Sequence, residues 1–189
     1  MIQLVVGLII FLGIHSVSIV ARPWRDAMVA RLGAGTWKGV YSLISLLGFV
    51  LMVGGYSAAR LEPSLLYVPP VGLRHLAGLL MLPVFPLLFA TYLPGRLKRW
   101  AKHPMLVAVK LWALAHLLAN GMLADVVLFG SLLVWAVLDR ISVKRRGEAP
   151  PATDGKILND VLAIVLGLAV YGVFVMGGHL MLFGVSPFG

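Results

Sequence analysis

The sequence contains no cysteine among its 189 residues. This absence excludes disulfide bonds, iron–sulfur clusters and thiolate ligation of zinc or haem iron. Charged residues are also scarce, at 12% of the chain with seven acidic side chains, whereas a soluble domain carries about 25%. The five histidines are therefore the side chains from which we expect any transition-metal ligand to come.

What the chain has in place of charge is apolar residues, at 60% of the composition with a mean hydropathy of +0.97. This balance predicts an all-α integral membrane protein, because helices satisfy their own backbone groups in lipid. The N-terminal apolar stretch has neither a positively charged start nor a small-x-small cleavage site. We expect it to be a retained transmembrane helix.

Apolar stretches predict a bundle of about six transmembrane helices in a single domain, residues 1–189. They cover residues 2–21, 39–58, 72–93, 104–119, 122–139 and 157–180. Pro83 and Pro86 are expected to kink the third helix. Asn120 and Gly121 predict a tight hairpin in which the glycine takes the left-handed conformation. The polar, proline-containing stretch 145–156 is expected to be a surface loop.

The basic residues predict the orientation of this bundle. Of the 16 Lys and Arg residues, Arg60 and Arg74 fall in loops on one side, Lys110 falls within a span, and all others lie on the opposite side. The positive-inside rule then places both termini on the outer, periplasmic side. The net charge of +9 is explained by topology and anionic lipid, so no nucleic-acid partner is expected.

Segment 22–38 mixes apolar and basic residues at helical spacing. This pattern predicts a helix along the cytoplasmic membrane interface, with Trp24 and Trp37 as anchors.

Ionisable side chains within the spans are the first functional candidates, because a charge at the bilayer centre costs about 2.5–3.5 kcal/mol. Lys110 lies seven residues after His103 and either extends toward the cytoplasmic face or pairs with an acid or a cofactor carboxylate. His103 precedes Pro104, which favours the first helical position, so His103 is expected at the helix cap near the interface.

His116 is expected to share one helix face with Trp112 and Asn120 through i,i+4 spacing. His15 lies in the first span. Either histidine is explained by hydrogen bonding between helices or by cofactor ligation.

His75 and His179 lie near the outer ends of their spans, at a depth similar to that of His116. These three predict a possible metal trio, although no HxxxH spacing supports it.

Four motifs together resemble the NnrU family of bacterial membrane proteins. They are HS at 15–16, KHPML at 102–106, WALAHLLANG at 112–121 and HLMLFGVSP at 179–187. The resemblance implies a multi-pass protein of the bacterial inner membrane. The family name comes from a link to nitrite and nitric oxide reductase expression, which implies a role in redox or denitrification-linked nitrogen-oxide physiology.

That family is similar to the 15-cis-ζ-carotene isomerase, an integral membrane haem b enzyme. The similarity implies that His15 and His116 are axial ligands of haem iron, and His103 matches the histidine of its HP motif. Lys110, or Arg22 and Arg25, would then meet the propionates, and Trp112 would line the pocket. The sequence departs from the isomerase at Ala113, where a cysteine is expected, so ligand exchange with a thiolate is excluded.

The predicted topology does not pair His15 with His116 directly. His15 lies ~10 Å and His116 ~20 Å from the cytoplasmic ends of their helices. Boundary shifts of about 2–4 residues and a helix tilt of about 20° would remove most of this mismatch. His116 with His75 or His179 is the alternative ligand pair.

Four functions follow from these features. The first is a haem b sensor or maturation factor, with nitric oxide as a possible partner. The second is a haem-dependent cis–trans isomerase of a lipid-soluble polyene or carotenoid-like substrate. The third is a membrane methyltransferase, which the sequence disfavours because Met105 replaces an aromatic residue and Glu148 is the one glutamate downstream. The fourth is an assembly factor without a cofactor.

Overall fold

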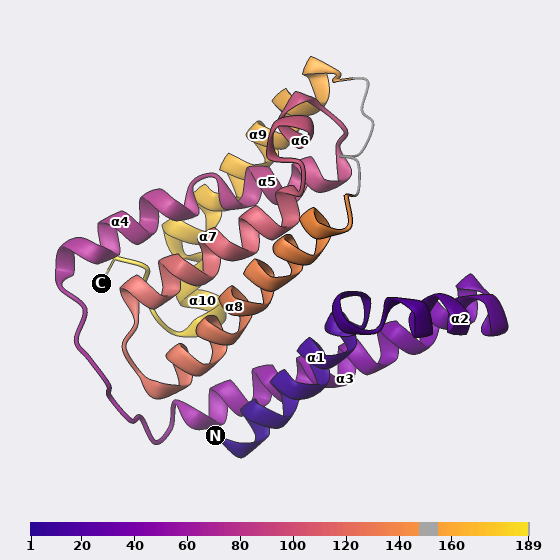
Figure 1. Ribbon diagram of the computed structural model, residues 1–189. Coiled ribbons are helices and arrows are strands. Elements are labelled where there is room, and N and C mark those ends of the chain that lie inside the picture. The colour runs from indigo at the N-terminus through magenta and orange to yellow at the C-terminus, as the bar shows by residue number, and fades with distance from the viewer. Residues whose placement is uncertain (148–154, 189) are drawn as a thin grey trace.

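The computed structural model describes residues 1–147 and 155–188, and most of these residues form helices (Figure 1). In chain order the helices are α1 (Ile2–Val20), α2 (Arg22–Leu32), α3 (Ala34–Ala59), α4 (Val71–Met81), α5 (Val84–Tyr92), α6 (Arg96–Ala101), α7 (Pro104–Ala119), α8 (Leu123–Arg145), α9 (Ile157–Val173), the π-helix η1 (Phe174–Gly178) and α10 (His179–Phe183).

Five helical segments within the described residues are long and apolar enough to cross a membrane. They are Ile2–Val20, Ala34–Ala59, Val71–Tyr92, Leu123–Arg145 and Ile157–Phe183. This confirms the predicted all-α membrane fold. The remaining predicted span, 104–119, forms α7, whose 16 residues cover ~24 Å, less than the ~30 Å of a hydrocarbon core.

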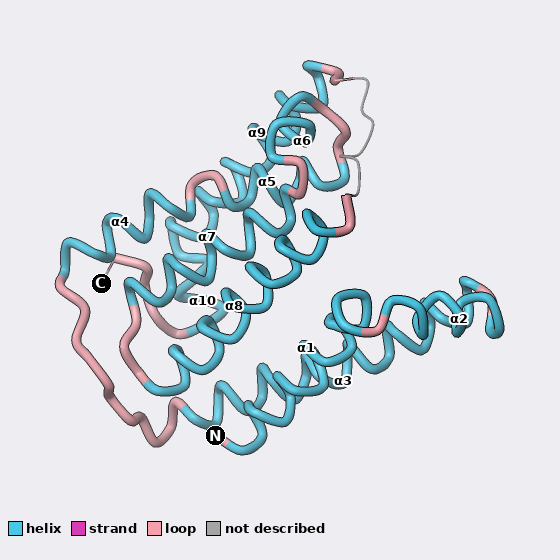
Figure 2. The backbone as a smooth tube through the Cα atoms, viewed as in Figure 1, coloured by secondary structure: helices cyan, strands magenta, loops and turns pink. Residues whose placement is uncertain are grey.

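The helices form two groups that meet at α8. α1 packs along α3, and α2 covers the first part of α3. In the second group, α7 lies against α4, α5 and α8, while α9 packs on α5. Figure 2 shows the long loop that joins α3 to α4 between the two groups. Both termini lie at the same end of the molecule, as the predicted topology requires, and α2 and α6 lie toward the other end (Figure 1).

The contact between α1 and α3 depends on buried glycines. A side-chain carbon at Gly55 would overlap the backbone of Leu4, and one at Gly7 would overlap the backbone of Met52. Small residues allow this close backbone approach, which gains van der Waals packing where lipid offers no hydrophobic driving force. These glycines therefore set the separation of α1 and α3.

The predicted interfacial segment 22–38 is divided between two helices. The first helix ends at Gly33, whose φ of 82° is in the left-handed region that glycine adopts without strain. Trp37 and Lys38 therefore belong to the start of α3. The rings of Trp24 and Trp37 still meet, with centroids 5.9 Å apart in an edge-on arrangement.

The proline kink in the third span is confirmed at Pro83, where α4 and α5 are separated. Pro86 does not add a second break, because it lies in the first turn of α5, where no intrahelical bond is lost. Its ring instead contacts α9 at the position of Gly167, where a side-chain carbon would overlap it.

The hairpin at Asn120–Gly121 forms as predicted, but Gly121 is not left-handed. The glycine is required because its Cα faces the backbone of Tyr67 in the loop between α3 and α4. Its carbonyl oxygen accepts a hydrogen bond from Leu66 N–H at 2.8 Å, and Leu123 N–H donates to Ser64 O at 2.8 Å. The sequence pattern did not show this pairing because the partner segment lies far away in the chain.

The last predicted span, 157–180, is interrupted. After α9 the chain forms the π-helix η1, in which Gly177 has a φ of 142°, and a short helix α10 follows. Such π-bulges are frequent at functional sites. His179 is the first residue of α10, so it follows this break directly. Most of the predicted loop 145–156 lies outside the described residues.

Asp160 connects α9 to the start of α6. Its two carboxylate oxygens accept hydrogen bonds from the backbone N–H groups of Arg96 and Leu97, each at 2.9 Å. The carboxylate therefore satisfies two of the donors that a helix start leaves without intrahelical partners.

We expect Asp160→Ala to lower the free energy of unfolding by about 1–2 kcal/mol, the effect of losing a helix cap. Thermal unfolding in detergent measures it. Asp160→Asn retains one acceptor oxygen and should lose less than Asp160→Ala. Equal stability of all three proteins would contradict a capping role.

Candidate functional site

His15 lies on α1 in an aromatic environment. Its ring centroid is 4.2 Å from that of Phe11, 5.2 Å from Tyr41 on α3 and 5.8 Å from Trp135 on α8. The indole N–H of Trp135 is buried without a hydrogen-bond partner among the described residues. His15 therefore lies where α1, α3 and α8 meet, beside the indole N–H of Trp135.

His116 lies on α7 between two rings. It stacks on buried Phe129 of α8 at 4.4 Å and contacts Trp112, one turn earlier on α7, at 5.1 Å. Asn120 donates a hydrogen bond from Nδ2 to the carbonyl oxygen of His116 at 3.0 Å. The predicted face shared by Trp112, His116 and Asn120 is confirmed by these contacts.

His179 is the residue that the helix break brings to His116. The two ring centroids are 6.5 Å apart, although 63 positions separate them in the chain. The ring of Phe183, one turn later on α10, lies 4.9 Å from that of His179. The structure thus assembles the alternative ligand pair of the sequence analysis.

The same hydrogen bond orients all three of these histidines. Nδ1 lies 2.6 Å from Phe11 O in His15, 2.8 Å from Trp112 O in His116, and 2.7 Å from Val185 O in His179. A carbonyl oxygen only accepts, so each Nδ1 carries the proton. In the neutral form of each ring the lone pair is on Nε2, the nitrogen that is then available to a metal ion.

The structure does not bring His15 and His116 together. They contact Trp135 and Phe129, which lie six positions apart on α8 and therefore ~9 Å apart along its axis. At 100° per residue, those two positions also face different sides of α8. The depth mismatch expected from the sequence is present.

The trio of His75, His116 and His179 does not gather either. His75 instead stacks with Phe188, at a centroid distance of 6.1 Å. In the part of the chain that the structure describes, no three His, Cys, Asp or Glu side chains are placed to hold a metal ion. Of the predicted trio, His116 and His179 are the two histidines whose rings lie near each other.

The other predicted site residues lie elsewhere. His103 is the N-cap of α7, with Pro104 at the first helical position, as predicted. Lys110 is partly buried on α7. Six residues separate it from His116, which places it ~9 Å nearer the basic end of the bundle. Neither residue is brought to the histidine pair.

Sequence reasoning missed Asp125, which is 3% exposed and is the buried charged side chain among the described residues. Its carboxylate accepts hydrogen bonds from the Tyr56 hydroxyl at 2.6 Å and from Met122 N–H at 3.1 Å. The sequence signal for this role was the position of Asp125, just inside a predicted span and three residues after its expected start.

Tyr67, in the loop between α3 and α4, closes this end of the bundle. Its hydroxyl lies within hydrogen-bond distance of the carbonyl oxygens of Leu117 and Asn120. Burial, and secondarily the charge of Asp125, raises the pKa of the Tyr67 phenol above its usual value. The hydroxyl therefore remains a donor over the physiological pH range.

Arg22 and Arg25 lie at the opposite end, beside Arg146. Two adjoining cavities of about 320 and 190 Å³ occur there, and both are lined by Ser18 and Arg25. None of His15, His116 and His179 lines either cavity.

Comparison with known proteins gives one finding. A family model described as NnrU protein matches residues 3–187, nearly the whole chain. No curated protein and no solved structure matches the chain.

Proposed function

The chain belongs to the NnrU family, and we propose that it binds haem b in the membrane through His116 and His179, in redox or nitrogen-oxide physiology. The observation that carries this proposal is the pair itself: two imidazoles on different helices, with ring centroids 6.5 Å apart and both Nδ1 atoms hydrogen-bonded to backbone carbonyl oxygens.

The spacing agrees with a shared iron. At about 2.0–2.1 Å per metal–nitrogen bond, two imidazoles on opposite sides of one metal have centroids about 6–6.5 Å apart. The chain offers no thiolate, so histidine is the strongest donor type for iron that it contains.

The surroundings fit an apolar macrocycle. Trp112, Phe129 and Phe183 supply aromatic surface around the two histidines. Arg60 is the cation at this end of the bundle that contacts α10, where its guanidinium donates to Phe183 O at 3.4 Å. Arg60 is therefore better placed for a propionate of this pair than Lys110, Arg22 or Arg25.

Bound haem would supply an iron centre that exchanges electrons, or that takes nitric oxide in place of one histidine. His116 and His179 would hold the iron, and the hydrogen bonds at Nδ1 would fix the orientation of both rings. The aromatic side chains would surround the group with apolar surface, which influences its reduction potential. Asp125 and Tyr56 fix the start of α8 behind Phe129.

Absorbance spectra of the detergent-purified protein, expressed with ample haem and measured before and after dithionite reduction, test the proposal. We expect a Soret band with sharp reduced α and β bands in the native protein. His116→Ala and His179→Ala should each lower haem occupancy about ten-fold or more, since even outer-shell changes cost 10–100-fold in metal affinity. His75→Ala is the control and should retain the native spectrum.

Contrary outcomes are clear. Loss of haem in His15→Ala with retention in His179→Ala would replace the proposed pair by His15 and His116. A native protein without haem, and without iron, copper or zinc by elemental analysis, would overturn the cofactor and leave an assembly role.

A further inference from the structure

The basic end of the bundle contains a second candidate site, separate from the histidines. The smaller cavity, of about 190 Å³, is lined by Ser18, Arg22, Arg25 and Arg146. These residues come from three helices or their ends: α1, α2 and the C-terminal end of α8. A cavity whose walls are three guanidinium groups and a serine favours an anion.

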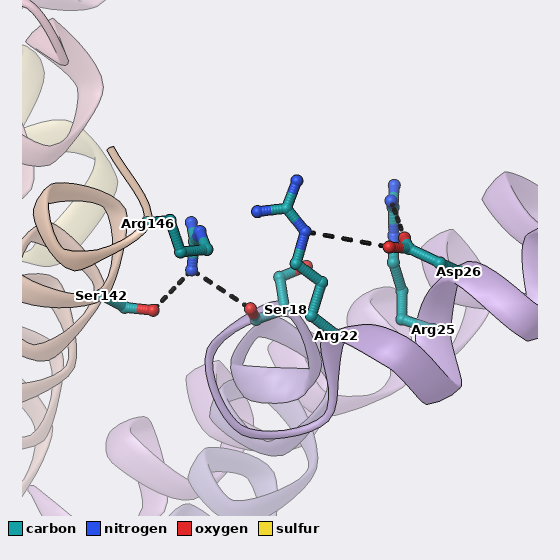
Figure 3. Close-up of polar contacts among 6 residues, drawn as sticks. All are labelled: Ser18, Arg22, Arg25, Asp26, Ser142 and Arg146. Carbon is teal, nitrogen blue, oxygen red and sulfur yellow. Dashed lines mark hydrogen bonds and ion pairs between the residues drawn. The ribbon is translucent and has the colours of Figure 1, made fainter. Parts of the chain in front are cut away.

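Hydrogen bonds hold the arginines at this cavity (Figure 3). Nη1 of Arg146 donates to Ser18 O on α1 at 3.2 Å and to the hydroxyl of Ser142 on α8. Arg146 thereby connects α8 to α1. Nη1 of Arg25 donates to Asp26 at 2.8 Å, and Nε of Arg22 lies 3.8 Å from the same carboxylate. The side chains are thus preorganised before any ligand arrives.

Guanidinium groups make up most of the lining of this cavity, and the carboxylate of Asp26 lies beside two of them, those of Arg22 and Arg25 (Figure 3). A guanidinium group binds phosphate oxygens through parallel N–H donors, and several together give a strong site for a phosphate group.

The larger cavity, of about 320 Å³, adds an apolar compartment. It shares Ser18 and Arg25 with the smaller cavity, and Lys38 also lies in its wall. The remainder of its lining is mostly apolar and comes from α1, α2 and α3: Ile14, Val17, Val29, Ala34, Trp37 and Tyr41. A ligand that fills both cavities has an anionic head and an apolar body.

We propose that these two cavities bind an anionic phospholipid, with its phosphate between Arg25 and Arg146 and its glycerol and upper acyl region against α1 and α3. The site lies at the end of the bundle that carries most of the basic residues, which faces the anionic leaflet in the predicted topology. A phospholipid and inorganic phosphate both present a phosphate group to the arginines. The apolar compartment favours the lipid, because inorganic phosphate has no apolar part to fill it.

Native mass spectrometry of the full-length protein, released from detergent with added dioleoyl phosphatidylglycerol or dioleoyl phosphatidylcholine, tests this site. We expect retained phosphatidylglycerol and about ten-fold less phosphatidylcholine. Arg146→Gln and Arg25→Gln should each lower phosphatidylglycerol retention about ten-fold, the effect of one lost charge-assisted bond.

Matched controls separate a site from general charge. Arg145→Gln and Arg31→Gln remove the same charge from the same end, but neither residue lines a cavity, so both should retain the lipid. Equal losses in all four variants would overturn the site in favour of non-specific attraction. Thermal stabilisation by inorganic phosphate, with no retained phosphatidylglycerol, would overturn the lipid and assign a soluble anion.

Discussion

Replacing Gly55 by leucine should prevent α1 from packing on α3 and lower the free energy of unfolding by about 3 kcal/mol or more. The expected loss lies at the upper end for overpacked sites, because the new side chain meets the backbone of Leu4 rather than a flexible side chain. Backbone atoms of a packed helix cannot move aside individually. Thermal or denaturant unfolding in a fixed detergent measures the loss.

Gly39→Leu is the matched control on the same helix. A side-chain carbon at Gly39 has no atom within 4 Å, so this change should alter stability by no more than about 1 kcal/mol, the helix-propensity difference. If both variants unfold together, the α1–α3 contact does not depend on small residues. If Gly55→Leu alone unfolds early, Gly7 and Gly48 are the next positions to test.

The membrane architecture was predictable because its signal is local. Apolar stretches placed α1, α7 and α9 within two residues at their starts, and Pro83 marked the break between α4 and α5. Length and hydropathy act on each helix separately, so no knowledge of its neighbours is needed.

The histidine pair could not be fully predicted because it depends on non-local geometry. The glycines at 177 and 178 indicate a weak point in the last span, and Gly177 takes a φ of 142° in the π-helix. They do not indicate that the ring of His179 lies near that of His116, which depends on how α10 packs against α7. Depth in the membrane alone made His179 an alternative ligand in the sequence.

The same limit applies to the arginine-lined cavity and to Gly121. Charge patterning located the basic end correctly, but the cavity between Arg25 and Arg146 requires α1, α2 and α8 to meet there. Gly121 was predicted from turn chemistry, whereas close approach of the distant Tyr67 backbone is what requires it.

A second large effect is expected at the buried bond between Asp125 and Tyr56. Asp125→Ala removes an acceptor from the Tyr56 hydroxyl and from Met122 N–H, and leaves both donors at a buried helix start. Bonds to charged groups contribute about 1.5–3 kcal/mol each, so for two bonds we expect a loss of about 3–6 kcal/mol. Unfolding of the same detergent-solubilised protein measures it.

A double-mutant cycle with Tyr56→Phe isolates the bond between α3 and α8. If the bond is direct, the double variant should be about 1.5–3 kcal/mol more stable than the sum of the two single losses predicts. Additive losses would show that Asp125 acts only as the cap of α8. The cycle also bears on the histidine pair, because Phe129 packs between Tyr56 and His116. If the proposed haem spectrum is observed and persists in Asp125→Ala, α7 and α10 would hold the proposed iron without support from α3.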